Sequence, residues 1–585
     1  LNEPAVLQAI KLRYSLLDIY TYSGIVLIAT NPFQKVEQLY SQDIIQAYAG
    51  KRRGELDPHL FAIAEDAYRC MKTDGQNQTI VVSGESGAGK TVSAKYIMRY
   101  FASVEEDTDQ ALGSDHKADM SDVEKQILAT NPIMEAFGNA KTTRNDNSSR
   151  FGKYLEILFD KSTSIIGARI RTYLLERSRL VFQPSTERNY HIFYQLLAGL
   201  NPEDKKELGL STADDYKYTN QGGFPKIEGI DDAEEFQITK DALALIGVDG
   251  TKQMEIYKIL AALLHLGNID IAATRNDAHL SSDEPNLAKA CELLGIDAVN
   301  FAKWCVKKQI TTRSEKIVTN LNHKQALVAR DSFAKYIYSA LFDWLVNYIN
   351  ADLCPEEVAA RVNSFIGVLD IYGFEHFEKN SFEQFCINYA NEKLQQEFNQ
   401  HVFKLEQEEY VKEQIEWSFI DFVDNQPCID VIENRMGILS LLDEESRLPA
   451  GNDQSWIEKM YQNLDKEPTN KVFKKPRFGQ TKFIVSHYAL DVTYDIDGFI
   501  EKNRDTVGEG HLDVMKNTTN ELLQDVLSIV DKNAAEVEAS KAPAKGKIAN
   551  KKPTLGSMFK NSLVELMKTI NSTNVHYIRC IKPVS

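Results

Sequence analysis

Runs of consecutive apolar residues, many of them β-branched, predict buried strands at two places in the chain. These runs are Thr79–Ser83 and Phe365–Leu369, and both have the composition of a strand covered on its two faces. Tyr154–Phe159 and Ile165–Leu175 are also predicted as strands, joined by a short turn. The hydrophobic pattern therefore predicts at least four strands, spread over the first two thirds of the sequence.

Helical spacing of apolar residues follows two of these strands. Behind the glycines after Ser83, the apolar residues from Val92 to Phe101 recur near the spacing of a helix. From Ser381 to about Gln414 the chain contains no Pro or Gly, and it predicts one amphipathic helix of more than 30 residues. Strands mixed with helices indicate an α/β core with inserted helical subdomains.

Two segments contain too few aliphatic residues to form a packed core. Ser103–Asp122 is acidic, and Asp531–Leu555 ends in lysines interleaved with Ala, Pro and Gly. Neither segment can bury enough apolar area to offset the entropy of ordering, so both are predicted to be solvated surface loops. The lysines are Lys541, Lys545, Lys547, Lys551 and Lys552.

The composition excludes several classes of protein. Among 585 residues there are 67 Lys and Arg against 84 Asp and Glu, a net charge of −17. That charge argues against a general nucleic-acid coat, although it leaves room for a local basic patch. No apolar stretch reaches the ~18 residues needed to cross a bilayer, and the first residues lack the features of a signal peptide. Seven scattered cysteines without a Cys-x-x-Cys pair indicate reduced thiols in a cytosolic protein.

A glycine-rich segment between the first strand and the helix after it fits the pattern Gly-x-x-x-x-Gly-Lys-[Ser/Thr]. Its glycines let backbone N–H groups approach phosphate oxygens, and the start of the helix adds its dipole. Lys90 would neutralise the β- and γ-phosphates, and the Thr91 hydroxyl would bind Mg²⁺. The alternative is a chance glycine turn, but a phosphate site requires this strand-to-helix context. The segment consists of Gly84, Glu85, Ser86, Gly87, Ala88, Gly89, Lys90 and Thr91.

Phosphoryl transfer also needs a Mg²⁺ shell, a positioned water and a contact to the γ-phosphate, and two later segments could supply them. Asn145–Lys153 packs amides, hydroxyls and a guanidinium into nine residues before a strand. Asp370–Glu375 places an acid at the end of a strand and Gly373 three residues later. Each segment alone could be an ordinary polar loop. Their order after the phosphate loop is typical of a nucleotide switch.

At these segments the sequence closely resembles the motor domain of myosins. Gly84–Thr91 is similar to the family's phosphate loop, Asn139–Tyr154 to its first switch, and Leu369–Glu375 to its second switch. Asn380–Gln414 resembles the relay helix, and His576–Pro583 the strand that returns to the central sheet. The resemblance covers nearly the whole chain and is greatest to fungal class V myosins, which transport cargo. It implies a P-loop NTPase core with a mixed, mostly parallel central sheet and large inserted helical subdomains.

The resemblance implies that the site binds ATP and Mg²⁺ through five residues. Thr91 and Ser149 would bind the Mg²⁺ directly, with Asp370 one layer further from the ion. Lys90 and Asn145 would contact the phosphates. These roles are expected by similarity to the family, and the residue types suit them.

A second group of residues would act on the reacting phosphate. By the same resemblance, Ser148 and the Gly373 N–H would hold the γ-phosphate and the attacking water, and Arg150 and Glu375 would form a salt bridge that closes the site. These two charges are far apart in the sequence, so their pairing can report that two separate elements have met. Around a site that excludes water, such a gate can switch hydrolysis on and off. The alternative is that both are ordinary surface charges.

Three residues near the start of the chain resemble the family's adenine-binding loop. They are Asn31, Pro32 and Tyr40. Tyr40 lies one residue later than the family's pattern expects. A contact between its ring and the base is nevertheless the role that the resemblance implies.

Three segments resemble parts of the family's surface for filamentous actin. The lysine-rich loop occupies the position that meets the acidic filament, where electrostatic steering favours a fast encounter. Pro427–Glu445 resembles an actin-binding helix–loop–helix in which Met436 and Ile438 are the expected apolar contacts, while the leucines that follow could equally lie in the core. Glu315 occupies a position that the family requires to be acidic or phosphorylated for strong actin activation. Since its charge is permanent, no phosphorylation is expected there.

The family's organisation predicts six parts in this chain. They are the N-terminal part of the nucleotide-binding core (1–102), a surface loop (103–122), an upper subdomain with the first switch (123–365), a lower actin-binding subdomain with the second switch and relay helix (366–530), the lysine-rich loop (531–555), and a returning helix and strand (556–585). The family's N-terminal barrel, converter and lever are expected outside this chain, as are the regions for calmodulin-like light chains and cargo. A cytoplasmic location on the actin cytoskeleton is expected, with no insertion into a membrane.

The main prediction is an actin-activated Mg²⁺-ATPase that couples ATP hydrolysis to cyclic actin binding and transport. The alternatives are another P-loop NTPase, such as a GTP switch or nucleotide kinase, and a nucleotide-bound actin-binding scaffold without catalysis. A GTPase would be expected to carry an Asn/Thr-Lys-x-Asp motif, and the chain has none. A scaffold would be expected to have lost one of the residues named above for phosphate, Mg²⁺ or gate, and all are present.

Overall fold

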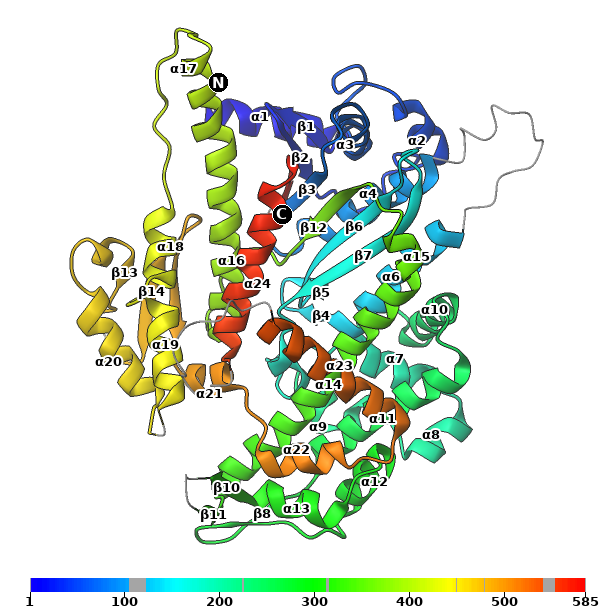
Figure 1. Cartoon of the computed structure of the whole chain (residues 1–585), viewed down its shortest axis with the longest axis vertical. Coiled ribbons are helices and arrows are strands. Elements are labelled where there is room, and N and C mark those ends of the chain that lie inside the picture. Colours follow the sequence, from blue (N-terminus) through cyan, green and yellow to red (C-terminus); the bar gives the residue numbers. More distant parts are fainter. Residues whose placement is uncertain are drawn as a thin grey trace.

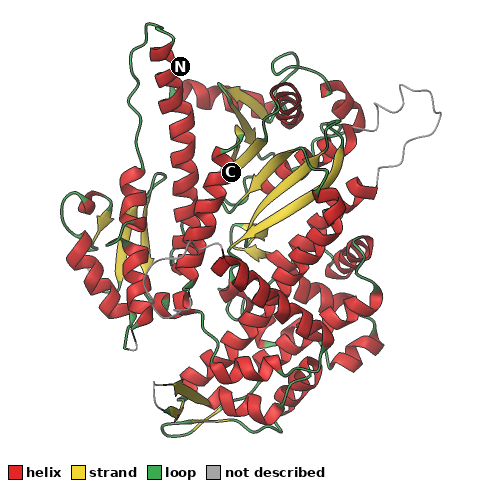
Figure 2. Cartoon of the chain, in the orientation of Figure 1, coloured by secondary structure: helices red, strands yellow, loops and turns green. Residues whose placement is uncertain are grey.

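The computed structural model of the chain describes residues 2–104, 122–223, 226–311, 315–448, 450–477, 479–539 and 553–583. Figure 1 shows a central sheet in the upper half, a large group of helices below it, and a smaller group of helices and strands on the left. Figure 2 shows that the long strands gather in the central sheet and that helices make up most of the rest. This layout agrees with an α/β core that carries inserted helical subdomains.

The central sheet has seven strands: β1 (Tyr20–Ser23), β2 (Val26–Thr30), β3 (Gln78–Gly84), β6 (Gly152–Phe159), β7 (Ile165–Tyr173), β12 (Ser364–Asp370) and β16 (Asn574–Ile581). Their order across the sheet is β1-β2-β16-β3-β12-β6-β7. β2, β16, β3 and β12 are parallel to one another, whereas β1 pairs antiparallel with β2, and β6 pairs antiparallel with both β12 and β7. The sheet is therefore mixed and mostly parallel, and the four strands predicted from the hydrophobic pattern are confirmed.

Alternate residues along the central strands enter two separate hydrophobic cores. On β3, Ile80 and Val82 belong to one core and Val81 to the other. On β16, Ile578 and Tyr577 divide in the same way. Successive side chains of a strand point to opposite faces, so the sheet is buried on both sides. This burial explains why the central strands are apolar at nearly every position.

Helices cover both faces of the sheet. α3 (Leu60–Asp74), α4 (Lys90–Val104) and α14 (His323–Leu353) contribute side chains to the first core. α16 (Phe382–Asn399) and α24 (Leu555–Asn571) contribute to the second core, and Figure 1 shows them side by side. Two shorter helices near the start of the chain are α1 (Glu3–Ser15) and α2 (Gln42–Tyr48).

The group of helices below the sheet in Figure 1 packs on α14 and extends the first core. A hairpin of β10 (Lys307–Thr311) and β11 (Lys316–Asn320) projects from its lower end. The helices of this helical subdomain are α6 (Asp122–Gly138), α7 (His191–Gly199), α8 (Pro202–Leu208), α9 (Lys217–Asn220), α10 (Asp232–Leu245), α11 (Gly250–Asn268), α12 (Pro285–Leu294), α13 (Ala298–Val306), α22 (Glu509–Lys516) and α23 (Glu521–Ala539).

The smaller group on the left of Figure 1, the left-hand subdomain, packs against α16 around the second core. It holds a three-stranded antiparallel sheet whose strands occur in chain order. Its elements are α18 (Gln426–Glu433), α19 (Ile438–Arg447), α20 (Asp453–Leu464), β13 (Phe473–Lys474), β14 (Lys482–Ser486), β15 (Asp491–Asp495) and α21 (Phe499–Arg504).

The long helix predicted from Ser381 to about Gln414 is present but not regular. α16 begins at a capping box formed by Ser381 and Gln384, passes through a π-helical turn at Gln400–Leu405, and continues as α17 (Glu406–Lys412). The predicted length of more than 30 residues is confirmed, since the helix runs without a break from Phe382 to Lys412, but its π-helical turn was not predicted. A π turn changes the backbone hydrogen bonding over a few residues, which the spacing of apolar residues does not reveal.

The predicted surface loop at Asp531–Leu555 is also wrong in its first part, because α23 continues to Ala539. Leu522, Leu523 and Val526 bury one face of this helix, and the helix extends into the polar residues beyond them. α4 likewise continues to Val104, and the rest of the acidic segment up to residue 121 lies outside the described residues. No helix of the described part of the chain combines the length and apolar character needed to cross a bilayer.

Candidate nucleotide site

The phosphate loop and the second switch meet at one edge of the sheet. β3 and β12 are parallel neighbours, so their carboxyl ends lie side by side. Gly84–Thr91 leaves β3 and enters α4, whereas Asp370–Glu375 leaves β12 in the direction of α16. In open α/β sheets this is the edge at which ligands bind. The fold therefore brings together the two segments that the sequence predicted as parts of one site.

Three glycines give the phosphate loop its shape. Gly84, Gly87 and Gly89 have φ angles of 152°, 81° and 91°, which residues with a Cβ rarely adopt. At Gly84 an added Cβ would also lie 2.3 Å from the carbonyl oxygen of Cys580 on β16. A loop of this shape can present several backbone N–H groups to an anion.

Lys90 is buried at the first turn of α4. Its ammonium donates to the Glu85 carbonyl at 2.7 Å, and within the described residues no carboxylate lies within 4.0 Å of it. Burial lowers the pKa of Lys90, while the carboxylates of Asp370 and Glu375 act in the opposite direction from a greater distance. A buried ammonium without a carboxylate in direct contact is suited to a phosphate.

The first switch is a hairpin of β4 (Asn139–Thr142) and β5 (Asn145–Ser149). In this hairpin the Asn145 amide donates to the Asn147 carbonyl at 3.3 Å and accepts from the Asn147 N–H at 3.0 Å. Contact between Asn145 and a phosphate would therefore require an exchange of these bonds, and it stays a prediction.

Three oxygen-bearing residues lie at the position predicted for Mg²⁺. The hydroxyls of Thr91 and Ser149, from α4 and β5, are 3.4 Å apart. Asp370 is buried at the end of β12; its burial raises its pKa, while two nearby lysines and the Thr91 hydroxyl act in the opposite direction. Hydroxyl and carboxylate oxygens are the donors that Mg²⁺ prefers. The chemistry of this donor set fits the predicted ion.

The predicted pairing of Arg150 with Glu375 is confirmed. The guanidinium donates to the two carboxylate oxygens at 2.7 and 3.4 Å, and the side chains are only 1% and 2% exposed. Arg150 also donates to the hydroxyl of Ser148 at 3.1 Å. A water-excluded, two-bond ion pair thus joins the first switch to the second.

Sequence reasoning gave no role to Glu176, which holds Arg150 from another side. Its carboxylate accepts from Arg150 at 2.6 Å and from Arg179 at 2.7 Å. Burial acts to raise the pKa of Glu176, but the two guanidiniums outweigh it and lower the pKa to about 2. The available signal was an acid followed by two arginines in the segment Leu174–Arg179.

The second switch is in contact with both the phosphate loop and α16. A Cβ at Gly373 would lie 2.5 Å from the Gly84 carbonyl oxygen and 2.6 Å from the Ser86 nitrogen. Two residues further, the Asn388 amide on α16 accepts from the Glu375 N–H at 2.9 Å and donates to the Glu375 carbonyl at 2.8 Å. Because of these two bonds, a movement of the second switch would displace α16. No motif in the sequence pointed to Asn388.

The predicted adenine loop lies beside the phosphate loop. The Asn31 amide donates to the Gly87 carbonyl at 2.8 Å, and Pro32 follows it at the surface of this loop. The ring of Tyr40 stacks on Tyr96 at 3.5 Å between centroids, and its hydroxyl is 2.5 Å from that of Tyr20. The loop therefore reaches the site, while the contact between Tyr40 and a base stays a prediction.

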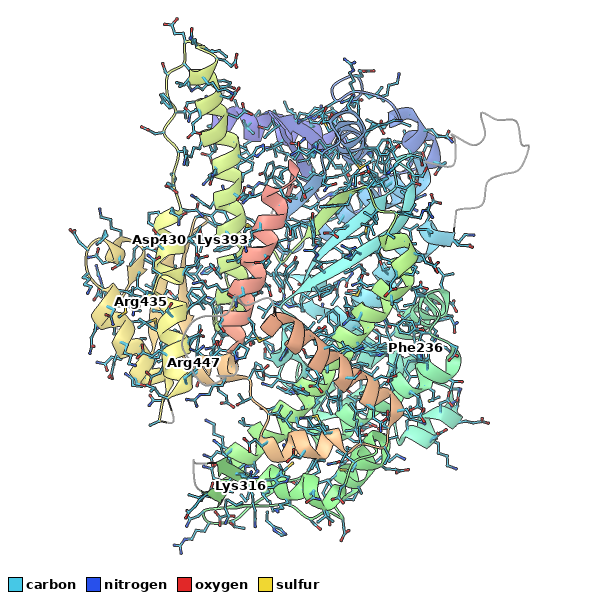
Figure 3. All side chains as sticks on the ribbon, in the orientation of Figure 1. Phe236, Lys316, Lys393, Asp430, Arg435 and Arg447 are labelled. Atoms are coloured by element: carbon cyan, nitrogen blue, oxygen red, sulfur yellow. The ribbon has the colours of Figure 1, made fainter. Side chains whose placement is uncertain are left out.

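The predicted helix–loop–helix for a partner is formed by α18 and α19. Met436 is 52% exposed between them, next to Arg435, which Figure 3 labels in the left-hand subdomain. Ile438 is fully buried, as are the leucines after it, because this face of α19 packs in the second core. The assignment of Ile438 to a surface contact is therefore wrong, and Met436 stays a candidate.

The remaining predicted partner contacts are Glu315 and the five lysines of the lysine-rich loop. Glu315 is exposed directly before β11, at the lower end of the molecule where Figure 3 labels Lys316. Lys541, Lys545, Lys547, Lys551 and Lys552 lie outside the described residues.

Comparison with known proteins points to a single family. The whole chain, residues 1–585, matches the family described as Myosin head (motor domain). The chain is 75% identical over 587 residues to Myosin-2 of Lachancea kluyveri and 75% identical over 593 residues to Myosin-2 of Saccharomyces cerevisiae; both alignments cover 100% of this chain and 38% of the relative. It is 56% identical over 590 residues to Myosin-52 of Schizosaccharomyces pombe, again over 100% of this chain and 38% of the relative. The chain thus spans well under half the length of these curated relatives.

The match over the full length confirms the family that the phosphate loop and the two switches predicted. The relatives are yeast proteins, in keeping with the expected resemblance to fungal myosins. The mostly parallel sheet, with the phosphate loop and second switch on adjacent strands, confirms the predicted fold class. The chain belongs to the myosin head (motor domain) family.

Proposed function

We propose that this chain is the ATP-hydrolysing, actin-binding part of a cytoskeletal motor that transports cargo along filaments. The observation that carries the proposal is the buried pair of Arg150 and Glu375. It joins two switches that are 225 residues apart in the sequence, at the edge of the sheet where the phosphate loop lies. A pair of this kind can be joined or parted, and it can therefore link the content of the nucleotide site to a movement.

The residues around the phosphate loop would bind MgATP. Lys90 would neutralise phosphate charge, and Asn145 would add a contact to the phosphates. Thr91 and Ser149 would hold Mg²⁺, with Asp370 behind them, and the bound ion would supply charge neutralisation between the phosphates. The position of the Lys90 ammonium, without a carboxylate in direct contact among the described residues, supports this role.

The residues of the two switches would act at the γ-phosphate. Ser148 and the Gly373 N–H would orient the phosphate and the attacking water. Arg150 and Glu375 would close the site against bulk solvent, which strengthens the electrostatic contacts inside it. Because Asn388 holds the backbone of Glu375 on both sides, closure would also shift α16. A small movement at the phosphate would then be carried along a rigid helix.

Filamentous actin is the proposed partner of this chain. The exposed Met436, and the exposed Glu315 between the two strands of the β10–β11 hairpin, support a contact with a filament, and the lysine-rich segment would add electrostatic steering. Calmodulin-like light chains and cargo would bind to regions outside this chain. We place the protein in the cytoplasm, on the actin cytoskeleton.

The proposal is tested by steady-state MgATP turnover with and without filamentous actin. The wild-type chain is expected to hydrolyse ATP, to be activated by actin, and to co-sediment with actin in an ATP-sensitive manner. Lys90→Ala should abolish turnover, whereas Arg99→Ala, which removes an exposed positive charge from the same helix, should not. MgATP turnover in Lys90→Ala would contradict the proposal. Wild-type turnover that filamentous actin does not increase would contradict it as well.

The role of Glu315 needs its own measurement. Glu315→Ala is expected to reduce actin activation several-fold while basal turnover in the absence of actin stays unchanged. The control is Glu292→Ala, whose side chain is 69% exposed on α12 of the same subdomain. Equal actin activation in Glu315→Ala and the wild type would remove Glu315 from the interface.

A further inference from the structure

Behind Glu375 lies a buried chain of four polar side chains, which we call the relay network: Asn388, Tyr494, His487 and Glu392. Asn388 and Glu392 are one turn apart on α16, Tyr494 is on β15, and His487 lies between β14 and β15. Tyr494, Asn388 and Glu392 are fully buried and His487 is 7% exposed. Asn388 and Glu392 lie in the segment that resembles the relay helix, but the sequence predicted no role for any of the four residues.

The direction of each hydrogen bond in the network follows from the first. The Asn388 oxygen accepts from the Glu375 N–H, so its nitrogen must face the Glu375 carbonyl, to which it donates at 2.8 Å. The second hydrogen of that nitrogen donates to the Tyr494 hydroxyl at 2.9 Å. The Tyr494 oxygen thus already accepts a bond, and its own proton is available for a different partner.

That partner is the imidazole of His487, whose Nε2 lies 2.7 Å from the Tyr494 oxygen. If Nε2 accepts the Tyr494 proton, the ring of a neutral His487 carries its hydrogen on Nδ1. Nδ1 lies 3.0 Å from a Glu392 oxygen, which can only accept when ionised. The opposite tautomer would place two lone pairs face to face at Glu392 and leave the Tyr494 proton without this acceptor. With a neutral His487 ring the bonds therefore run in one direction, from Asn388 through Tyr494 and His487 to Glu392.

Glu392 is fixed in turn by two further donors. The Tyr488 N–H donates to it at 2.6 Å, and the Asn425 amide donates to it at 2.5 Å. A buried polar group that loses its partner is costly, so the four members of the relay network support one another's orientation. The far end of the network, nearest to the second switch, is the Asn388 amide.

We infer that Tyr494 and His487 are positioning residues for Glu375: through Asn388 they hold the backbone of the second switch where Glu375 can pair with Arg150. This inference rests on the proposed ATPase function and adds to it. The two residues lie too far along the chain of bonds to touch the phosphates, so their effect would pass through the Asn388 amide. Without the Tyr494 hydroxyl, the second N–H of the Asn388 amide would lose its acceptor, and the amide would keep only its two bonds to Glu375.

A zinc site is the competing interpretation of the same region. Glu392, His487 and the neighbouring Cys428 are residue types that bind zinc, and the Cys428 sulfur lies 3.8 Å from the His487 Nδ1. Burial raises the pKa of the Cys428 thiol, which favours the protonated form over the thiolate that a metal requires. Glu392 also has its two oxygens engaged by donors. The hydrogen-bonded network accounts for these contacts without an ion.

The test is Tyr494→Phe, which removes only the central hydroxyl. MgATP affinity is expected to stay within 2-fold of wild type, while single-turnover hydrolysis slows at least 10-fold. The matched control is Tyr389→Phe, which also removes a buried hydroxyl from the second core. Tyr389 is on α16, as Asn388 is, but its hydroxyl bonds Glu433 rather than a residue of the relay network. Hydrolysis in the double variant with His487→Gln should be no slower than in the slower single variant, because both residues act through the same series of hydrogen bonds. A purely structural role would lower thermal stability without this separation of affinity from hydrolysis.

Three results would overturn the inference. The first is hydrolysis at the wild-type rate in Tyr494→Phe while the wild-type chain turns over ATP normally; a wild-type chain without turnover would instead contradict the proposed function. The second comes from NMR of the wild-type protein labelled with ¹⁵N-histidine, with His487 assigned by its loss in His487→Gln: a proton on Nε2 rather than Nδ1. The third is one equivalent of zinc in the purified wild-type protein that His487→Gln lacks. The last two need no folded Tyr494→Phe variant.

Discussion

At the scale of single residues, Arg150 shows how this site uses buried charge. Its guanidinium bonds Glu375, Glu176 and Ser148 at once, and almost none of it is exposed. A buried cation with two carboxylates tolerates the loss of one partner poorly, because the remaining charges cannot be solvated. The gate can therefore open only if Arg150 keeps Glu176 when it releases Glu375.

Glu375→Gln tests this division of roles. The variant should still bind MgATP, since Arg150 keeps its bonds to Glu176 and Ser148. Its hydrolysis step should slow about 100-fold or more, because a neutral amide closes the gate less firmly by about 3 kcal/mol. Single-turnover measurements separate binding from hydrolysis. Glu378→Gln, an exposed acid three residues away, serves as the control. Rapid hydrolysis in Glu375→Gln would show that the pair is not a gate.

Glu176 predicts a dependence of stability on pH. Its pKa in the folded protein is about 2, against an ordinary value of 4.5, because Arg150 and Arg179 outweigh the effect of burial. A lowered carboxyl pKa stabilises the fold above the ordinary pKa, and this contribution, about 3 kcal/mol, is lost as the pH falls from about 5 toward 2. Urea unfolding of wild type and Glu176→Gln should therefore differ most at pH 6 to 7 and progressively less below pH 5. A difference independent of pH would contradict the lowered pKa.

At the scale of elements, the second switch is held between the phosphate loop and α16. Gly373 touches the loop backbone, and two residues later Asn388 holds Glu375. The element is thus short and bonded on both sides. It has room for only small displacements, and these pass directly to the helix.

Gly373→Ala should break this arrangement. The added Cβ would lie 2.5 Å from the Gly84 oxygen, so the switch must move away from the phosphate loop. Hydrolysis is expected to fall at least 10-fold, and the loss should appear in single-turnover experiments. At Gly250 an added Cβ meets nothing within 4 Å, so Gly250→Ala is the matched control. Comparable rates for the two variants would mean that the switch does not need this close approach.

Part of the fold could be predicted because its signal is local. β3 and β12 are buried on both faces, so their apolar runs are unambiguous, and the phosphate loop is a contiguous pattern. The π-helical turn at Gln400–Leu405 was missed because it leaves the apolar spacing almost unchanged. The burial of Ile438 was missed because the sequence shows that a helix has an apolar face but not what covers it. Pairing of Arg150 with Glu375 was expected only through the family resemblance.

The partners within the relay network could not be predicted from the sequence. Asn388 lies 106 residues before Tyr494 in the sequence, and their contact depends on how β14 and β15 pack on α16. The one local signal is the spacing of Asn388 and Glu392, four residues apart on the buried side of a helix. Such a pair indicates a buried polar contact but not its partner.

At the scale of the whole molecule, Asp505 ties the end of α21 in the left-hand subdomain to Arg177 and to α14, the helix on which the helical subdomain packs. It follows α21 directly and lies 2.6 Å from an Arg177 nitrogen and 3.6 Å from the Lys335 ammonium on α14. Its own side chain is only 11% exposed. Nearby, Lys502 on α21 pairs with Glu383 at the start of α16 at 2.8 Å. These ion pairs restrain the relative orientation of parts that would share a filament contact.

Asp505→Asn should loosen that restraint. Affinity for filamentous actin is expected to fall several-fold in co-sedimentation, because binding would then have to fix an orientation that the wild type already holds. MgATP affinity should be unchanged. Asp497→Asn provides the control, since that side chain is 80% exposed and 3.9 Å from its lysine. Unchanged actin affinity in Asp505→Asn would show that other contacts set the orientation.

The position of β16 has a consequence for how the protein is made. It is the last strand of the central sheet in the sequence, yet it lies between β2 and β3, which are among the first. While a ribosome adds the intervening residues, the edges of β2 and β3 that later flank β16 stay unpaired. These edges could pair with incorrect strands of the nascent chain. Gly84 packs against the carbonyl of Cys580, so the phosphate loop also lacks its support until that residue emerges. The nucleotide site is therefore completed only after β16 has been synthesised, although its defining motif is synthesised early.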